Sequence, residues 1–223
     1  MRWIIRGSMA ALVLASILVL AFEALYHHAL TKVPALPEPP PPQGTPFIRE
    51  ALWAVEGGGS EDVPILWAGN FISLQPRQDR YGVMNTARMY VLTQLTHRGH
   101  HDWDLKCGAT EVWLSRHASV DDLKRELAAW TYFGRGALGI DAAAHAWFCK
   151  NADELRLEQI ALILGAPQSP GQMEKPEWRR RRIRVVLDEL ADAGVVTRDA
   201  ADAAADAPLD VFERPAELPD SDE

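Results

Sequence analysis

Apolar residues in this chain recur every three or four positions, which is the period of a helix and not that of a strand. Met84, Ala87, Val91 and Leu95 have this spacing and are expected to share one helix face. The same period returns in two later stretches, through the residues Leu123, Leu127, Trp130, Val186, Leu187 and Leu190. The pattern therefore predicts a mainly α protein.

Start and stop signals place the helices of the second half. One helix is expected to begin at Ser119, and another to begin near Pro176 and end at Gly194. A short alanine-rich helix is expected after Thr197.

The stretch from Tyr132 to Pro170 contains a compact chain reversal and then two helices. Gly134, Gly136 and Gly139 interrupt an aromatic-ended helix, and glycine is the residue that adopts the positive φ angles that such a turn needs. The three glycines therefore predict a tight turn.

The two helices after this turn have their own end signals. Asp141 is expected to cap an alanine-rich helix, and Asn151 with Glu154 forms the pattern of a capping box for the next one. Gly165 and Pro167 are expected to end that second helix.

The N-terminus has the pattern of a membrane segment. Arg2 and Arg6 precede an apolar run from Gly7 to Phe22, which continues past the single Glu23. A cleaved signal peptide is the alternative, but the run is longer than a usual signal core and no clean small-x-small site follows it. An uncleaved anchor is therefore favoured, with the arginines in the cytoplasm and the rest in the periplasm of a Gram-negative cell.

A proline-rich segment, Pro34 to Pro46, follows the apolar run. Prolines at this density form neither a helix nor a ladder, so a semi-rigid polyproline spacer is expected, which would lift the following domain from the bilayer.

Acidic residues outnumber basic ones, 31 to 23, which gives a formal net charge of −8. A protein with this charge is not expected to bind nucleic acids in general, because their phosphates are also negative. Much of the acid lies near the C-terminus, where the sequence has little apolar periodicity. A disordered acidic tail is expected there.

Cysteine and histidine offer weak signals. Cys107 and Cys149 both fall in apolar helical patterns, so a disulfide and two buried free thiols stay equally open. His97 and His101 could share a helix face with Asp102 or Asp104 as metal ligands, but Gly99 disfavours a helix there. A polar loop without a metal is the favoured interpretation.

The Tyr132–Pro170 stretch resembles the peptidoglycan glycosyltransferase domain of class A penicillin-binding proteins and monofunctional transglycosylases, glycosyltransferase family 51. The residues in step with the family pattern are Tyr132, Phe133, Gly134, Gly136, Gly139, Ile140, Ala143, Ala144, Trp147, Phe148, Leu155, Pro167 and Pro170. The resemblance implies a lysozyme-like helical domain behind one transmembrane helix. It implies a role in polymerising lipid II into glycan strands.

The family's catalytic motifs are only partly present. The resemblance assigns the base that deprotonates the acceptor hydroxyl to Glu56, although Gly57 replaces the aspartate that follows it in the family. The second carboxylate is missing at its ungapped position, which Cys107 occupies, and Glu111 one helical turn later is the replacement candidate. Lys106 directly precedes Cys107.

The same resemblance suggests the residues that contact substrate. Thr86, with Gly82, is what remains of the family's polar Gly-x-Ser-Thr motif, and Lys106 and Arg182 are further candidates for binding substrate. Arg182 ends a basic patch from Arg179 that suits lipid headgroups or a diphosphate, with a solvated arginine face that offsets the acidic tail as the alternative. No metal ligand set and no certain cofactor are assigned, and a divalent cation is expected only if the protein is active.

The sequence therefore predicts an anchor at 1–28, a proline-rich linker at 29–46, a glycosyltransferase-like domain at 47–205 and an acidic disordered tail at 206–223. The implied partners are lipid II or a glycan strand, the inner membrane and cell-wall synthases. Because the motifs are degenerate, a non-catalytic scaffold that binds glycan, lipid II or a synthase is an alternative. A lysozyme-type enzyme with Glu56 as its acid is a third candidate.

Overall fold

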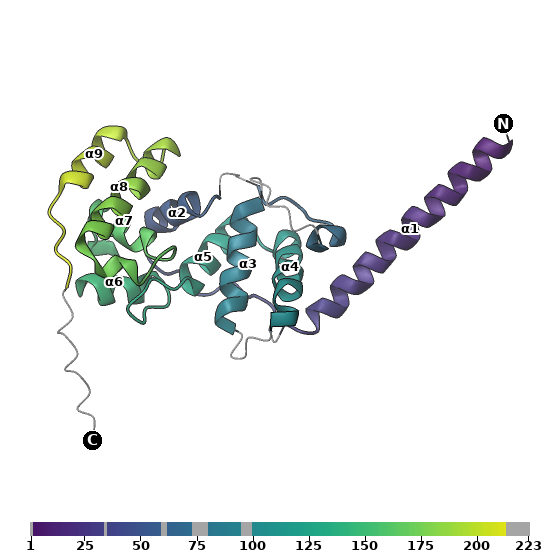
Figure 1. The fold of residues 1–223 in the computed structure, drawn as a ribbon, viewed down its shortest axis with the longest axis horizontal. Helices are drawn as coiled ribbons and strands as arrows, with labels where there is room; N and C mark the ends of the chain where they lie inside the picture. Colours follow the sequence, from purple (N-terminus) through teal and green to yellow (C-terminus); the bar gives the residue numbers. More distant parts are fainter. Residues whose placement is uncertain (1, 34, 59–61, 73–79, 95–99, 213–223) are drawn as a thin grey trace, which may run out of the picture. The chain divides into compact units, whose positions relative to one another are not determined.

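The computed structural model describes residues 2–33, 35–58, 62–72, 80–94 and 100–212. Its helices, with η marking short 3-10 turns, are α1 (Arg2–Leu30), α2 (Pro46–Val55), η1 (Ala68–Ile72), α3 (Tyr81–Gln94), α4 (His100–His117), α5 (Val120–Trp130), α6 (Ile140–Phe148), η3 (Ala152–Glu154), α7 (Leu157–Gly165), η4 (Gln172–Glu174), α8 (Pro176–Asp192) and α9 (Arg198–Asp206) (Figure 1). In these ranges the extended pairing is limited to the isolated bridge between Tyr132 and Leu138. The predicted mainly α fold is confirmed.

The chain divides into two compact units, and each unit is made of two separate stretches of the sequence. Unit 1 contains residues 1–41 and 56–130, and unit 2 contains residues 42–55 and 131–223. Helix α2 therefore belongs to unit 2, although it precedes most of unit 1 in the chain.

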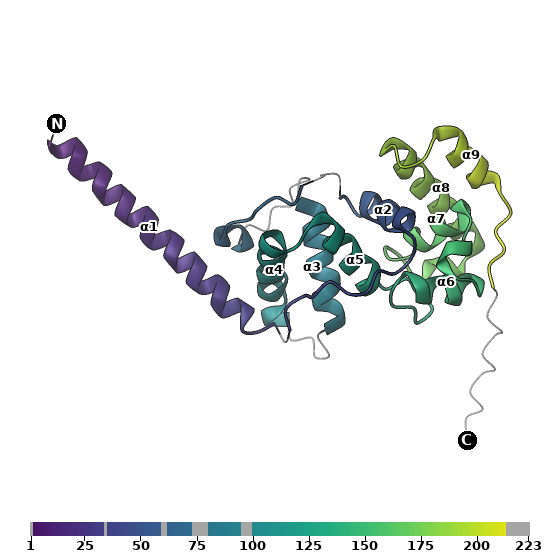
Figure 2. The same cartoon turned by 180° about the vertical axis from the view of Figure 1, so that it is seen from behind.

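Unit 1 is built around α3, which packs on both α4 and α5 (Figure 2). The predicted apolar stripe of α3 is confirmed for Met84, Ala87 and Val91, which are buried, while Leu95 lies outside the described residues. The predicted buried face of α5 is confirmed by Leu123 and Leu127. Both helices form because one apolar stripe of each enters a shared core.

The last turns of α1 also belong to this core. Tyr26 and Ala29 are buried against α4 and the segment before η1, together with Leu66, Ala68, Ala109 and Val112. Helix α1 as a whole has the length and apolar composition of a membrane span from Ser8 to Leu30. Its C-terminal end is therefore part of a folded unit and not a free stem.

The chain after α1 runs over unit 1 and does not stand away from it. Val33 packs with Tyr90, Val91 and Cys107, and the Tyr90 hydroxyl donates to the carbonyl of Ala35 at 3.0 Å. These contacts concern the first residues after α1. The polyproline spacer over the rest of the segment stays a prediction.

Unit 2 begins its second segment with the predicted turn. Gly134, Gly136 and Gly139 have φ angles of 81°, 77° and 86°, as expected for positions that favour glycine. Trp147 of α6 closes the turn from the other side, because its indole N–H donates to the Phe133 carbonyl at 2.9 Å. The turn and α6 thus form one packed element.

Two capping predictions need correction. Asp141 makes no cap bond, because its carboxylate instead accepts the Gly44 N–H at 2.9 Å, from a segment far away in the sequence. Asn151 and Glu154 do form a capping box, but it caps the short η3. Helix α7 begins later, where the Arg156 backbone N–H donates to the Gln159 side-chain oxygen at 3.0 Å.

The remaining helix ends agree with their signals. Helix α7 ends at Gly165, α8 begins at Pro176, and Gly194 after α8 has a φ of 73°. The Thr197 hydroxyl caps α9 by accepting the Ala200 N–H at 3.2 Å.

Helix α4 begins at His100, so the expected polar loop is helical from that residue onward. His97 and the side chain of His101 lie outside the described residues. Both cysteines are free thiols, with Cys107 buried and Cys149 exposed, so the expectation of burial holds only for Cys107.

The C-terminal segment 207–212 is bound to unit 2, although the sequence suggests disorder from residue 206. The Phe212 N–H donates to the Trp147 carbonyl at 2.8 Å, and the Phe212 carbonyl accepts from Arg135. Arg156 holds the Pro208 carbonyl at 3.2 Å. The rest of the expected tail, 213–223, lies outside the described residues.

Candidate functional site

Glu56 lies at the turn that follows α2 and is oriented by α3. Asn85 donates from its side-chain nitrogen to the Glu56 carbonyl at 2.9 Å and to the Glu56 carboxylate at 3.3 Å. Gly57, with a φ of 81°, packs so closely on Tyr81 that an added Cβ would lie 2.9 Å from the Tyr81 Cβ. The predicted base is thus a partly buried carboxylate with a fixed direction, not a freely solvated helix end.

Glu111 of α4 is in a buried ion pair. Its carboxylate lies 3.3 Å from the Arg80 guanidinium, and the two side chains are 9% and 5% exposed. Burial raises the pKa of Glu111, and Arg80 and Arg88 partly oppose this rise by favouring the charged form. A carboxylate enclosed in this way has little access to a substrate.

Thr86 and Lys106 lie in different settings. Thr86 is 1% exposed, and its hydroxyl donates to the Gly82 carbonyl of its own helix at 2.8 Å, so it faces the core. Lys106 is partly buried on α4, about 140° around the helix axis from Glu111 at five residues' spacing. Of these two candidates, only Lys106 is thus open to solvent in part.

Glu126 of α5 is a buried titratable group that the sequence reasoning missed. It is 1% exposed, and its carboxylate accepts the Trp130 indole N–H at 2.6 Å. Burial raises the pKa of Glu126 to about 7, and the nearby Asp122 carboxylate adds to the rise, although the Trp130 bond favours the charged form. The sequence did signal this group, because Glu126 and Trp130 lie four residues apart on a helix face that is otherwise apolar.

Arg182 of α8 packs in unit 2 against the glycine at the end of α7. A Cβ on Gly165 would lie 2.7 Å from the Arg182 Cγ, so only glycine admits the arginine there. One guanidinium nitrogen lies 3.7 Å from Glu189, and the Arg182 side chain is 12% exposed. Its Nε and a second nitrogen make no hydrogen bond within the described part of the chain. This arginine keeps hydrogen-bonding capacity for an anion.

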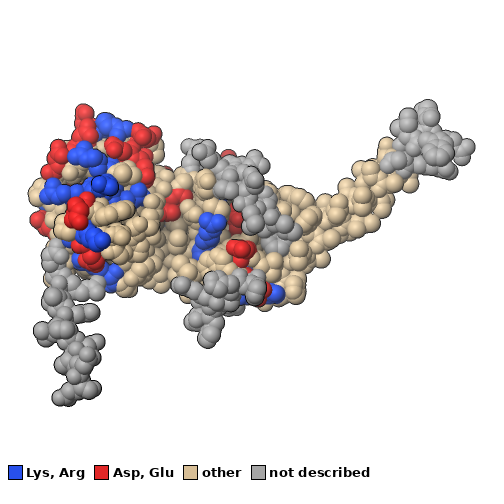
Figure 3. All heavy atoms as spheres, viewed as in Figure 1, with Lys and Arg blue, Asp and Glu red and all other residues tan. Residues whose placement is uncertain are grey.

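The neighbouring arginines of α8 do not form a continuous basic face. Arg179 is buried, and Arg184 pairs with Asp206 at 3.2 Å. Arg198 pairs with Asp188 and Asp192. Figure 3 shows basic and acidic side chains interspersed over α8 and α9. This surface fits the interpretation of a solvated arginine face offset by acid.

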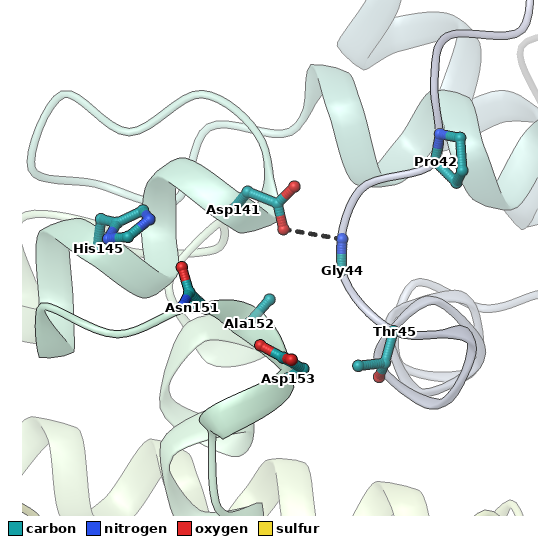
Figure 4. Close-up of a pocket in the computed structure, with 8 residues that line it drawn as sticks. All are labelled: Pro42, Gly44, Thr45, Asp141, His145, Asn151, Ala152 and Asp153. Atoms are coloured by element: carbon teal, nitrogen blue, oxygen red, sulfur yellow. Dashed lines mark hydrogen bonds between the residues drawn. The ribbon is translucent and has the colours of Figure 1, made fainter.

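A polar pocket of about 340 Å³ opens in unit 2 between α6, η3 and the segment before α2 (Figure 4). Its wall includes the side chains of Asp141, His145, Asn151 and Asp153, and the Asp141 bond to Gly44 joins its two sides. Carboxylate, amide and imidazole groups in such a pocket suit a ligand with hydroxyl or ammonium groups. Among the described residues no group of three or more His, Cys, Asp or Glu is placed to hold a metal ion.

Comparison with known proteins finds similarity in part of the chain. Residues 124–191, from α5 to α8, match the family model described as Transglycosylase. Penicillin-binding protein 1A of Rickettsia conorii is 33% identical over 100 residues, which are 43% of this chain and 12% of that protein. Penicillin-binding protein 1A of Streptococcus pneumoniae is 27% identical over 159 residues, 68% of this chain and 22% of that protein.

A crystal structure of penicillin-binding protein 1A from Haemophilus influenzae aligns with 61% of this chain and 17% of that one, at a TM-score of 0.38 and 20% identity. The chain thus spans at most about a fifth of the length of the relatives named here.

The resemblance to a transglycosylase domain of class A penicillin-binding proteins is confirmed, and its match to the family model has a clear boundary. The matched stretch includes Arg182 but begins after Glu56, Thr86, Lys106 and Glu111. The roles of all five residues stay predictions, as do the domain boundaries.

Proposed function

We propose that this chain is a membrane-anchored, glycosyltransferase-like protein of peptidoglycan synthesis that binds lipid II or a glycan strand. The observation that carries the proposal is the transglycosylase match over α5 to α8, the part of the chain that holds Arg182. Glycan and lipid-linked diphosphate are the chemistry that a family relative would recognise.

Binding is favoured over transfer because the paired carboxylates of the reaction are not both accessible. Glycosyl transfer needs a base for the acceptor hydroxyl and a group that stabilises the departing diphosphate. Glu56 is partly exposed and held by Asn85, as a base would be, but Glu111 is 7% exposed and paired with Arg80. The proposal therefore assigns no transfer step to Glu111.

Glycosyl transfer with Glu56 as the base is the second candidate. It is favoured by the fixed direction of the Glu56 carboxylate, which a solvated helix end would not have. In this case the departing diphosphate would require a divalent cation to stabilise its charge.

The membrane part of the proposal rests on α1. Its span from Ser8 to Leu30 is long and apolar enough to cross a bilayer once, and Arg2 and Arg6 precede it. We therefore place the N-terminus in the cytoplasm, and the two units at the outer face of the inner membrane. Cell-wall synthases at that face are the proposed protein partners.

The test is a paired binding and polymerisation assay on the full chain in detergent. Labelled lipid II is titrated with the parent and with the Glu56→Gln and Arg182→Gln variants, and its products are separated on a gel. Glu177→Gln, at an exposed carboxylate of α8, is the matched control.

If the proposal is right, the parent binds lipid II and Arg182→Gln binds it more weakly. Neither the parent nor any variant makes polymer. Polymer from the parent and the control but not from Glu56→Gln would show that the protein is a glycosyltransferase with Glu56 as its base, and not a binding protein. Shortening of pre-formed glycan by the parent would support the lysozyme-type reaction. Absence of binding to both lipid II and glycan by the parent would overturn the proposal.

A further inference from the structure

The polar pocket of unit 2 is bounded by two stretches of the chain that lie far apart in the sequence but belong to the same unit. Asp141 and His145 line it from one face of α6, about one helical turn apart (Figure 4). Asn151 and Asp153 line it from the start of η3, and Thr45 lines it from the segment before α2. None of the five predicted site residues is among the residues that line this pocket.

Two glycines let the two stretches approach each other closely. Gly44 has a φ of 63°, and a Cβ added to it would lie 2.8 Å from the side chain of Ile140. A Cβ added to Gly139 would overlap the side chain of Gln43. Each stretch therefore places a glycine against a side chain of the other, and packing fixes the distance between the two sides of the pocket.

Hydrogen bonds hold the same approach in place. The Asp141 carboxylate accepts the Gly44 N–H at 2.9 Å. Arg49 of α2 donates to the carbonyls of Gln43 and Gly44, at 3.2 and 2.8 Å. The pocket is therefore formed without a ligand, so a ligand that enters it pays little to order its walls.

The side chains that face the pocket offer both acceptors and donors. Within the described part of the chain the Asp153 carboxylate has no hydrogen-bond or ion-pair partner, so both of its oxygens can accept. The Thr45 hydroxyl oxygen accepts the Ile48 N–H at 3.2 Å, which leaves its own proton to donate. The Asn151 amide and the His145 imidazole can each act in both ways. A ligand that uses all of these groups must both donate and accept.

This requirement distinguishes between classes of ligand. An ammonium group or a metal cation cannot accept a hydrogen bond, so neither would use the donors of the wall. A sugar hydroxyl donates and accepts through the same oxygen, and neighbouring hydroxyls of a ring can meet both oxygens of one carboxylate. The volume of about 340 Å³ is at the low end of the range of about 300–1,000 Å³ for small-molecule sites, which suits a single sugar unit.

We propose that this pocket binds one sugar unit of a glycan strand, whose hydroxyls donate to the carboxylates of Asp141 and Asp153 and accept from Thr45. The inference rests on the glycan-binding part of the proposed function. It gives unit 2 a hold on the strand that needs neither Glu56 nor Arg182.

The test uses the full chain in a detergent without a sugar headgroup, with chitotetraose, a soluble tetramer of N-acetylglucosamine, as the probe. The imidazole of His145 is followed by NMR of protein labelled with ¹³C at its histidines, and His145→Gln identifies its resonance among those of the seven histidines. Dissociation constants are measured for the parent, for Asp153→Ala and for the control Asp202→Asn, at an exposed position of α9 in the same unit. Pentane-1,5-diamine is the second probe, which tests for an ammonium site.

Chitotetraose should shift the His145 resonance. Asp153→Ala should raise the dissociation constant about tenfold, as expected for the loss of a hydrogen bond to a charged group, and Asp202→Asn should leave it unchanged. A His145 resonance that moves with the diamine and not with chitotetraose would overturn the sugar assignment.

Two outcomes separate this inference from the proposed function. If the parent binds chitotetraose but the His145 resonance stays in place and Asp153→Ala binds equally well, the pocket is overturned and glycan binding stands. If the parent does not bind chitotetraose, the inference is overturned, and the lipid II titration then tests the proposed function by itself.

Discussion

The buried carboxyl of Glu126 should make the stability of this protein fall as the pH rises, and Glu126→Gln should remove that fall. Glu126 is 1% exposed and holds the Trp130 indole N–H at 2.6 Å, and burial raises its pKa to about 7. Glutamine has the same shape and retains an oxygen for Trp130, so the substitution removes the titration without leaving a cavity.

The magnitude follows from proton linkage. Below about pH 4.5 the carboxyl is protonated in both the folded and the unfolded states and contributes no difference. Between about pH 4.5 and 7 the unfolded state loses its proton while the folded state keeps it, so the free energy of unfolding falls with pH. The shift from 4.5 to about 7 corresponds to a loss of about 3 kcal/mol, complete just above pH 7.

The assay is denaturant unfolding of the full chain in detergent, followed by circular dichroism between pH 4.5 and pH 8. Glu111 and Glu189 also have raised pKa values through burial and act with the same sign. The informative quantity is therefore the difference between the parent and Glu126→Gln. The loss of stability from pH 4.5 to 8 should be about 3 kcal/mol smaller in the variant, because effects of the amide that do not depend on pH cancel.

Asp202→Asn, at an exposed position of α9, is the control and should follow the parent. Parallel curves for the parent and Glu126→Gln would refute the reasoning, because the carboxyl would then ionise equally in both states.

Three further outcomes are expected. A maleimide should label Cys149, which is exposed, and spare Cys107, whose pKa burial raises to about 12; equal labelling in native protein, measured by mass spectrometry, would contradict this. Arg135→Ala removes two hydrogen bonds to Glu174, the stack on the Trp147 ring and the bond to the Phe212 carbonyl. It should therefore speed hydrogen exchange at the Phe212 amide and destabilise unit 2 by about 2 kcal/mol. Unchanged exchange would argue against the attachment of the segment 207–212 to unit 2. Gly165→Leu should lower the free energy of unfolding by about 1–3 kcal/mol through overpacking against Arg182 of α8, measured by denaturant unfolding. An unchanged free energy of unfolding would show that α8 moves away at no cost.

Local physics made much of the helical framework predictable from the sequence. The glycines at 134, 136 and 139 have the positive φ angles that their spacing suggests, because no other residue adopts them as easily. Thr197, Pro176 and Gly194 likewise mark helix ends through groups that act within one turn of themselves.

The sites depended on partners that sequence distance hides. Asp141 has the pattern of a helix cap, yet its hydrogen bond goes to Gly44, 97 residues away. The ion pair of Glu111 with Arg80 likewise joins two residues whose separation in the chain gives no sign of it. The docking of α1 onto α4 was equally invisible, since neither the apolar run nor Arg116 signals it alone.

The position of α2 in the chain has a consequence for the order in which the protein is made. Its apolar side chains, including Ile48, Leu52 and Trp53, pack on α7 and α8 of unit 2. Those helices begin at Leu157, about 100 residues later, which corresponds to about 5–20 s of synthesis at 5–20 residues per second. A newly made α2 must therefore wait unpaired while η1, α3, α4 and α5 of unit 1 are added. The short N-terminal segment of unit 2 thus needs protection from aggregation until the long C-terminal segment of the unit is made.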